Sequence, residues 1–397
     1  MNKISKSSNI LIAFFSNPEH ITPVYDAICF LSEKYNVTVV QRNAIPLNYS
    51  YPTNVTIYKV GSGLKHNENT TLVKTIVEYF QFIFKIRILL KQNKCLFLLL
   101  YDMNAFVAGN LATFFLRKPP IFYHQNETVL SYEIPPTRFF YFIKRLEMFF
   151  AKSCALLSFV EPNRAKLFLK DAGFERDYII VDNCPKRIEK IPMPYKELEK
   201  YKTKGCKIIL HRGPIGDGSS LDIHETLRSI KHWPLNSIFV IQGYRTQAEE
   251  NKCIKITKEE SIQDRVVFLP FISSYLELLE VVAAADVGLV LYKPNDVNRT
   301  HATPVKLYDY LACGVPAIVP KSMLYISDLI DSLKVGFSYE NSKSESIGEV
   351  ISKLLEHPDR NKMIENARKT HLDKLNYEYQ FSLLFNAISK IVKNNHI

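Results

Sequence analysis

Residues 303–318 combine side-chain types and spacings that suit the binding of a phosphorylated ligand. Thr303 is placed to cap a helix that begins at Pro304, where a missing N–H costs nothing. Lys306 and Asp309 are three residues apart and therefore share a face of that helix. The helix N-terminus and Lys306 suit a pyrophosphate, and the Asp309 carboxylate suits ribose hydroxyls. Taken alone, the local pattern favours an ordinary capped helix with one exposed Lys–Asp pair, so the choice depends on the rest of the chain.

The elements around this stretch form a strand–helix alternation that runs through the whole chain. Short apolar runs predict strands at residues 10–15, 37–41, 55–60, 95–101, 120–124, 155–160, 178–181, 207–211, 237–242, 266–269, 287–292 and 316–319. Segments of helical period lie at 24–34, 137–152, 163–172, 220–231, 274–284, 303–313, 345–356 and 377–393. This alternation predicts an α/β protein with parallel sheets and right-handed crossovers.

The alternation is interrupted once, by a segment rich in proline and lysine at residues 185–205. A chain of 397 residues is also too long for one compact core. We therefore expect two Rossmann-like, doubly wound domains, over 1–184 and 206–375, joined by a linker at 185–205. Residues 376–397 are expected to form a C-terminal helix that packs back on the N-terminal domain. Strand carboxyl ends of the two domains would face a central cleft, where a ligand is expected.

Composition excludes several other classes of protein. The net charge is +11, but the basic residues are dispersed and no nucleic-acid motif accompanies them. No apolar stretch reaches the roughly 20 residues that a membrane span needs. The seven cysteines include no Cys-x-x-Cys pair, which favours reduced thiols in a cytoplasm over disulfides or a zinc site. Asp-x-Asp and Gly-x-Gly-x-x-Gly motifs are absent from the sequence, so we expect no metal and no bound cofactor.

Four signals in a fixed order give the C-terminal half a resemblance to a known family. They are residues 211–215 (HRGPI), 241–243 (IQG), 266–292 with their Phe-Leu-Pro-Phe and Ala-Asp-Val-Gly-Leu stretches, and 303–318. Over about residues 205–340 the chain resembles the donor-binding half of the retaining GT-B glycosyltransferases of glycosyltransferase family 4, the bacterial group 1 type. This resemblance implies a GT-B fold with an acceptor-binding N-terminal domain and a C-terminal domain that binds a nucleotide-sugar.

The resemblance also implies roles for individual residues. Asp309 stands where the family has the glutamate that holds the ribose, and Lys306 matches a lysine near the pyrophosphate that acts in catalysis. Gly213 would let the backbone approach the donor closely. The loop 270–273 would bind the base through its backbone. The other residues expected to line the donor site are Gly243, Phe271, Ile272, Thr303 and Leu307.

The sequence departs from the family pattern at its acids and cations. His301 replaces the first acid of the family's Glu-x7-Glu motif, and Ser219 stands where an arginine or lysine usually precedes a glycine. Either Arg212 or Arg299 is then the candidate for the missing phosphate cation, and the sequence does not choose between them.

Residues 123–127 are the corresponding candidates in the N-terminal half. They follow a predicted strand and fall where the family often has a His-Glu stretch, so His124 and Glu127 are candidates to orient the acceptor hydroxyl. The alternative is that they are polar loop residues without a catalytic role.

Two basic, aromatic-rich helical segments, 72–91 and 137–152, offer two interpretations. They fit helices that lie on an anionic membrane surface, and they also fit ordinary amphipathic helices packed on a sheet.

The sequence thus predicts a hexosyl-type retaining glycosyltransferase that moves a sugar from a nucleoside-diphosphate sugar, UDP-linked rather than GDP-linked, to a saccharide or lipid-linked acceptor. Surface polysaccharide or glycolipid synthesis in the cytoplasm, with peripheral contact at the inner membrane face, is the expected context. The alternatives are a non-catalytic donor-binding or regulatory partner subunit, favoured by the missing acid and cation, and a binding protein for anionic polymers, favoured by net charge alone.

Overall fold

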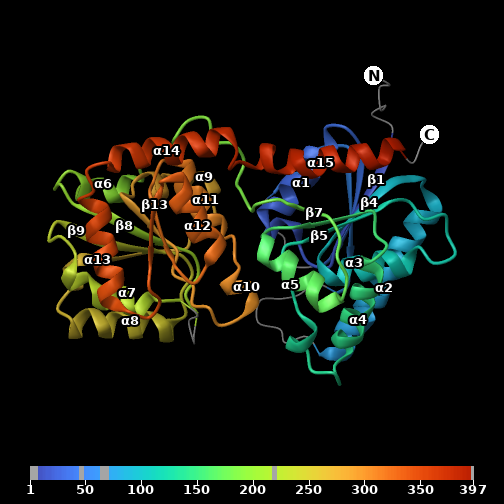
Figure 1. The fold of residues 1–397 in the computed structure, drawn as a ribbon, viewed down its shortest axis with the longest axis horizontal. Coiled ribbons are helices and arrows are strands. Elements are labelled where there is room, and N and C mark those ends of the chain that lie inside the picture. The colour runs from blue at the N-terminus through green and yellow to red at the C-terminus, as the bar shows by residue number, and fades with distance from the viewer. Residues whose placement is uncertain (1–7, 44–48, 63–70, 217–220, 395–397) are drawn as a thin grey trace. The chain divides into compact units, whose positions relative to one another are not determined.

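The computed structural model describes residues 8–43, 49–62, 71–216 and 221–394, and the chain divides into two compact units. The first unit comprises Met1–Asp182 together with Gln380–Ile397, and the second comprises Asn183–Tyr379 (Figure 1). The segment 185–205, expected as a linker, lies in the second unit and contains helix α6 (Lys196–Lys202). Leu198 of α6 is buried in the core of that unit, which explains why this lysine-rich stretch is helical.

The first unit is built on a parallel sheet with the strand order β3-β2-β1-β4-β5-β6-β7. Its register pairs Ile10 with Val37 on one side of β1 and Leu98 with Leu11 on the other. The strands are β1 (Asn9–Phe14), β2 (Asn36–Arg42), β3 (Val55–Val60), β4 (Cys95–Tyr101), β5 (Ile121–Gln125), β6 (Leu156–Phe159) and β7 (Tyr178–Ile180).

Helices cover both faces of this sheet (Figure 1). On one face, α3 (Asp102–Ala112) packs between α2 (Leu72–Gln92) and α4 (Phe139–Ala151). On the other, α1 (Thr22–Ser32) contacts the C-terminal helix α15 (Tyr377–Asn394), where the Phe30 ring meets the rings of Phe381 and Phe385. Helix α5 (Pro162–Ala172) follows β6.

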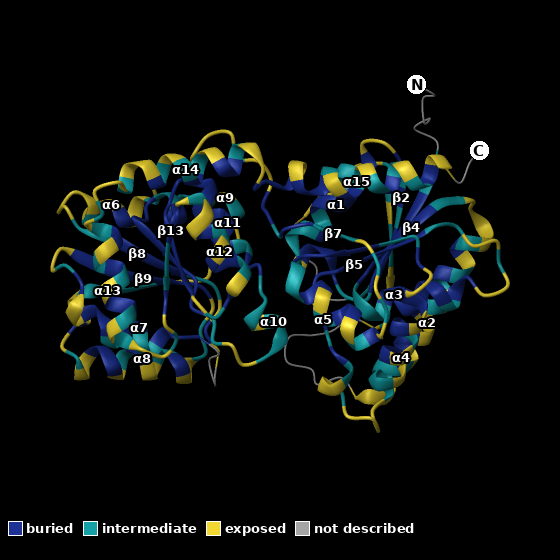
Figure 2. Ribbon diagram, viewed as in Figure 1, coloured by how far each residue is buried: buried dark blue, intermediate teal, exposed yellow. Residues whose placement is uncertain are grey.

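The second unit repeats the arrangement, with a parallel sheet of order β10-β9-β8-β11-β12-β13. The strands are β8 (Lys207–Arg212), β9 (Ser237–Gln242), β10 (Val266–Leu269), β11 (Val287–Leu289), β12 (Ala317–Pro320) and β13 (Gly336–Tyr339). The helices are α7 (Ile223–Ser229), α8 (Gln247–Glu259), α9 (Tyr275–Ala283), α10 (Val297–Thr300), α11 (Val305–Ala312), α12 (Leu324–Leu333), α13 (Ser344–Leu355) and α14 (Arg360–Asp373). One apolar cluster fills each face of the sheet (Figure 2).

The predicted α/β architecture is confirmed, but several individual elements differ from the prediction. Strand β13 was not expected, because its sequence Gly-Phe-Ser-Tyr carries no apolar run. Helix α11 begins at Val305 rather than at Pro304, and Pro304 occupies the N-cap position. Thr303 therefore does not cap this helix, since the Thr303 hydroxyl accepts a hydrogen bond from Asn183 at 3.3 Å instead.

Candidate functional site

An ion pair between Arg212 and Asp309 lies at the carboxyl edge of the second sheet. Arg212 is the last residue of β8, and Asp309 is on α11 with its side chain fully buried. The Arg212 Nη1 contacts Asp309 Oδ2, and the Tyr275 hydroxyl donates to Asp309 Oδ1 at 2.7 Å. Both carboxylate oxygens are thus engaged by side chains of the protein, and the carboxylate fixes the direction of the guanidinium.

Tyr310, the next residue on α11, ties the helix to the strands beneath it. Its hydroxyl lies within hydrogen-bond distance of the carbonyls of Leu210 and Leu289, at 3.3 and 3.2 Å, and accepts from the Arg212 N–H at 3.3 Å. The ring lies directly against Gly288, where an added Cβ would be 2.3 Å from a ring carbon. The helix therefore sits as close to β11 as a glycine permits.

Lys306 is a buried cation one turn before Asp309. Its amino group lies over the ring of Tyr292, 5.1 Å from the centroid, and a Cβ added at Gly213 would be 2.8 Å from Nζ. Within the described part of the chain, no carboxylate lies at ion-pair distance from this ammonium group. Burial and the positive charge of Arg212 lower the pKa of Lys306 to about 7.

His211 adds no charge to this region. The ring is fully buried on β8, and burial together with the charge of Lys306 holds the pKa of His211 well below its usual range. The imidazole is therefore neutral at physiological pH. The local charge is carried by Arg212, which is paired, and by Lys306, which has no carboxylate partner.

Two glycines shape the backbone where β8 and β9 end. Gly213 has φ +123° and Gly243 has φ +136°, both in the region that side chains rarely adopt. A Cβ at Gly243 would lie 2.5 Å from the carbonyl oxygen of Gly213. The two turns are thus in direct backbone contact, and Gly213 in turn lies against Lys306.

The other residues expected to bind the donor differ in their exposure and in their contacts. Phe271 is exposed, whereas Ile272 and Leu307 are buried in the core of the second unit, and the Leu307 N–H donates to the Pro304 carbonyl at 2.9 Å. Arg299, on α10, pairs with Asp296. Of the two candidate cations, Arg212 is therefore the one whose charge acts on Lys306. Ser219 lies outside the described residues.

In the first unit, His124 and Glu127 lie at the carboxyl end of β5. The His124 ring is buried, its Nδ1 is 2.9 Å from the Ser158 hydroxyl, and burial lowers the pKa of His124 to about 4. The Glu127 side chain is exposed, and the Glu127 N–H donates to Asp102 at 3.2 Å. A neutral, buried His124 is suited to hold its neighbours in position, while the exposed Glu127 carboxylate is accessible to a ligand.

Asp102 is a candidate that sequence reasoning missed. It follows β4 directly, has φ +61° and accepts the backbone N–H of Asn126 at 2.7 Å as well as that of Glu127. Burial raises the pKa of Asp102 to about 7, against the effect of these hydrogen bonds. A strained, partly buried carboxyl with a shifted pKa is typical of functional sites. The one signal in the sequence was an aspartate immediately after the apolar strand 95–101.

Comparison with known proteins gives a match to one family model. Residues 223–370 match the sequence model of the family described as "Glycosyl transferases group 1". No significant match is found among curated protein sequences. The match spans Lys306 and Asp309 but begins after Arg212.

Solved structures resemble the chain over nearly its whole length. The HepE protein of Anabaena in complex with UDP superposes with a TM-score of 0.69 at 12% identity, covering 96% of this chain and 100% of that one. Sucrose-phosphate synthase from Thermosynechococcus elongatus gives 0.73 at 13% identity, with 98% and 100% covered. WaaG, a glycosyltransferase involved in lipopolysaccharide biosynthesis, gives 0.63 at 14% identity, with 95% and 98% covered.

The fold is GT-B. At these identities the structural likeness establishes the arrangement of the chain and nothing finer. Together with the family match over residues 223–370, it supports the prediction of a glycosyltransferase. None of the helices in the described part of the chain is long and apolar enough to cross a membrane.

Replacing Lys306 by Met should stabilise the ligand-free protein. The pKa of Lys306 is about 7 when folded and about 10.5 when unfolded, so burial of its charge destabilises the fold most at and below pH 7. This cost shrinks as pH rises from 7 towards 10. We expect Lys306→Met to raise the free energy of unfolding by on the order of 1–3 kcal/mol at pH 6.5 and by less at pH 9, as measured by urea denaturation.

The exposed Lys321, replaced in the same way, serves as the control and should change stability little at either pH. A Lys306→Met variant that is less stable than the wild type at pH 6.5 would contradict the description of Lys306 as an unpaired buried cation.

Gly243→Ala should destabilise the protein more than Gly173→Ala. Both glycines have positive φ, but a Cβ at Gly173 meets nothing within 4 Å, whereas one at Gly243 collides with the Gly213 carbonyl. Gly173→Ala should cost about 1–2 kcal/mol from φ alone, and Gly243→Ala should cost about 1–3 kcal/mol more, because the Gly213 backbone must move. Equal losses in urea denaturation would show that the two turns are not in tight contact.

Proposed function

We propose that this chain is a retaining glycosyltransferase that takes a sugar from a nucleoside-diphosphate sugar, UDP-linked rather than GDP-linked. The single observation that carries the proposal is the unpaired, buried Lys306 beside the Arg212–Asp309 pair. A protein keeps such a destabilising cation where a ligand supplies the missing negative charge. The diphosphate of the donor provides that charge.

The proposed roles follow from the contacts of each residue. Lys306 and Arg212 bind the diphosphate and stabilise the charge that develops on it as the sugar leaves, which is usually the largest single contribution to catalysis. Asp309 positions Arg212, because both of its oxygens are already engaged. Gly213 provides a surface without a side chain next to Lys306, so the donor can approach the backbone.

Retention of the anomeric configuration follows from the family resemblance in this proposal. The acceptor would attack from the face that the diphosphate leaves, and a phosphate oxygen would assist its deprotonation, so no protein nucleophile is required. His124 and Glu127 are the proposed acceptor-orienting residues, with Asp102 holding the Glu127 backbone. UDP is favoured as the nucleotide because HepE was solved with UDP and with UDP-glucose.

The acceptor is proposed to be a saccharide or a lipid-linked saccharide at an anionic membrane surface, in surface polysaccharide or glycolipid synthesis. Helix α2 exposes an apolar stripe at helical spacing, formed by Val73, Val77, Phe80, Phe84 and Ile88. Exposed aromatic rings continue on α4 and in the loop after α3, at Phe142, Phe149, Phe114 and Phe115. An apolar area of this kind marks an interaction surface.

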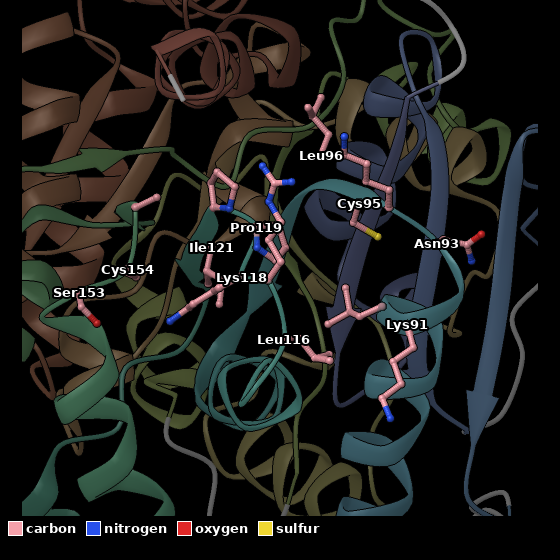
Figure 3. Close-up of a pocket in the computed structure, with 15 residues that line it drawn as sticks. Lys91, Asn93, Cys95, Leu96, Leu116, Lys118, Pro119, Ile121, Ser153 and Cys154 are labelled. Atoms are coloured by element: carbon pink, nitrogen blue, oxygen red, sulfur yellow. The ribbon is translucent and has the colours of Figure 1, made fainter. Parts of the chain in front are cut away.

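A basic pocket of about 750 Å³ lies in the same unit (Figure 3). Lys91, Lys94, Arg117 and Lys118 line it, at the ends of α2 and α3 and the starts of β4 and β5. It therefore lies at the amino edge of the sheet, opposite the edge that carries Asp102 and His124. Basic side chains next to exposed aromatic ones suit an anionic membrane.

Calorimetric titration tests the donor site. We expect micromolar binding of UDP, weaker binding of GDP, and a loss of about 10- to 100-fold in Lys306→Ala, because a hydrogen bond to a charged group contributes about 1.5–3 kcal/mol. The double variant Lys306→Ala plus Asp309→Asn should show no binding, while the exposed-site control Lys321→Ala should bind as the wild type does. Transfer from UDP-sugars would then be assayed with the same set.

No binding of either nucleotide by the folded wild-type protein would contradict the donor-site proposal. Binding of UDP without transfer from any UDP-sugar would favour the alternative of a non-catalytic, donor-binding partner subunit.

Vesicle sedimentation tests the membrane surface. The protein should bind vesicles that contain phosphatidylglycerol, bind less as salt is raised, and show little affinity for pure phosphatidylcholine. Phe80→Glu plus Phe84→Glu should weaken binding at least about tenfold, because two apolar contacts are replaced by negative charge. Leu324→Glu, at an exposed position of α12 in the other unit, is the matched control. Equal binding to both kinds of vesicle would contradict the proposal.

A further inference from the structure

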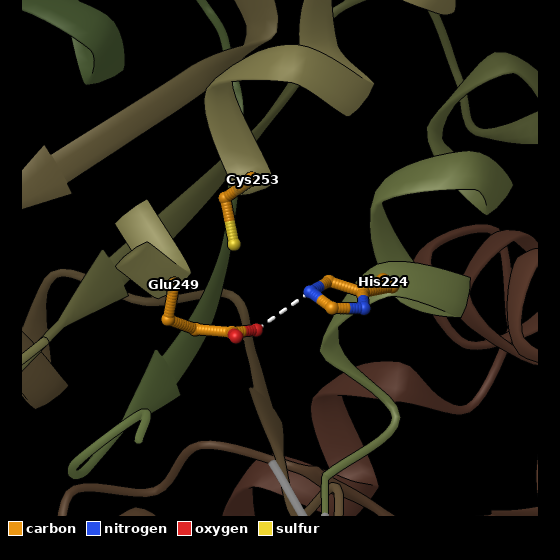
Figure 4. Close-up of side chains that lie close together, drawn as sticks. All are labelled: His224, Glu249 and Cys253. Atoms are coloured by element: carbon orange, nitrogen blue, oxygen red, sulfur yellow. Dashed lines mark ion pairs between the residues drawn. The ribbon is translucent and has the colours of Figure 1, made fainter. Parts of the chain in front are cut away.

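Three potential metal ligands converge between two helices of the second unit (Figure 4). His224 lies in the first turn of α7, and Glu249 and Cys253 lie one turn apart near the start of α8. The two helices pack against each other, and the side chains point into the space between them. An imidazole nitrogen, a carboxylate oxygen and a thiol sulfur therefore face one point.

The distances within this cluster fit a single ion. His224 Nε2 and Glu249 Oε1 are 2.6 Å apart, and the ligand atoms of the three residues all lie within 4.8 Å of one another. In a tetrahedral zinc site the metal–nitrogen distance is about 2.0–2.1 Å and the metal–sulfur distance about 2.3 Å, so ligand atoms lie roughly 3–4 Å apart. The 2.6 Å between His224 Nε2 and Glu249 Oε1 is shorter than this, so these two atoms must move apart to share an ion.

The ion pair between His224 and Glu249 does not account for the third side chain of the cluster. Glu249 Oε1 and His224 Nε2 are buried from solvent and lie 2.6 Å apart. Lys252 lies 3.4 Å from the other carboxylate oxygen, and Arg245 pairs with Glu250 nearby, so the remaining charges have their own partners. The Cys253 thiol, fully buried and aimed at the same point, has no part in an ion pair.

We propose that His224, Glu249 and Cys253 bind one divalent ion of the zinc class. Nitrogen and sulfur ligands select zinc, or cobalt in its place, over the hard ions magnesium and calcium, which prefer oxygen. Three protein ligands leave a fourth position, which water fills through the partly exposed side of His224.

Ion binding must displace one proton. A cysteine thiol is protonated at neutral pH when no ion is bound. The ion takes the sulfur lone pair as the S–H proton leaves to solvent, and it takes the Nε2 lone pair of a neutral imidazole. Affinity should therefore fall as pH falls, in step with proton release.

The position of the cluster gives the ion a structural role. Helix α7 follows the Gly213 turn and α8 follows the Gly243 turn, and a β-bridge between Ile215 and Arg245 joins the two connecting segments. An ion held by both helices cross-links the segments that carry these glycine turns. This role involves no step of sugar transfer, so the inference stands or fails independently of the proposed function.

Titration of the metal-stripped full-length protein with Co(II) tests the proposal. We expect one equivalent to bind with the intense visible bands of tetrahedral cobalt and a near-ultraviolet thiolate-to-cobalt charge-transfer band, and Zn(II) to displace it. Cys253→Ser should lose the charge-transfer band, and His224→Ala should weaken binding more than about 100-fold, since loss of even an outer-shell partner costs about 10- to 100-fold.

Cys206→Ser and His232→Ala are the matched controls, because they remove a cysteine and a histidine of the same unit outside the cluster. Both should retain the full spectrum. Zn(II) should also raise the melting temperature of the wild type and of both controls but not that of Cys253→Ser.

A weak, octahedral cobalt spectrum in the wild type would overturn the proposal, whatever the variants do. So would a charge-transfer band that persists in Cys253→Ser, because the thiolate would then come from another cysteine. If Cys253→Ser fails to fold, His224→Ala provides the same comparison, because the native His224 side chain is partly exposed.

Discussion

The buried contact between Arg212 and Asp309 is the interaction on which the rest of the candidate site depends. It joins the last residue of a central strand to the middle of helix α11, and the Tyr275 hydroxyl completes the set of contacts to the carboxylate. With Asp309 neutralising Arg212, the charge of Lys306 remains without a counterpart among the described side chains. In the proposed function, this pair of one compensated and one uncompensated cation would bind an anion without rearrangement.

This preparation has a cost that the surrounding fold offsets. A buried ammonium group next to a guanidinium destabilises the ligand-free chain. No carboxylate of the described residues pairs with Lys306, and its pKa is lowered by burial and by the charge of Arg212. Helix α11 nonetheless holds its place because Leu307, Tyr308 and Leu311 are fully buried in the core. Apolar packing on one side of the helix thus maintains an electrostatically unfavourable arrangement on the other.

The sequence predicted most of the strands because parallel strands buried on both faces read as apolar runs. It missed α3, whose residues are buried nearly all round and therefore show no amphipathic period, and it missed β13 for want of an apolar run. The spacing of Lys306 and Asp309 indicated a shared helix face. The ion pair of Arg212 with Asp309 joins residues 97 positions apart in the sequence, so no local motif predicts it. The cluster of His224 with Glu249 and Cys253 likewise joins separate helices and has no local motif.

The contact between the Tyr310 ring and Gly288 links an interior position to the geometry of the proposed donor site. No side chain exists at position 288, and the ring fills the space that one would occupy. Any larger residue there would push α11 away from the sheet, and Lys306 and Asp309 would move with it as one rigid piece. In the proposed donor site, a larger residue at this interior position would therefore change ligand affinity although position 288 itself touches no ligand. The residues that determine binding would thus extend beyond those in contact with the donor.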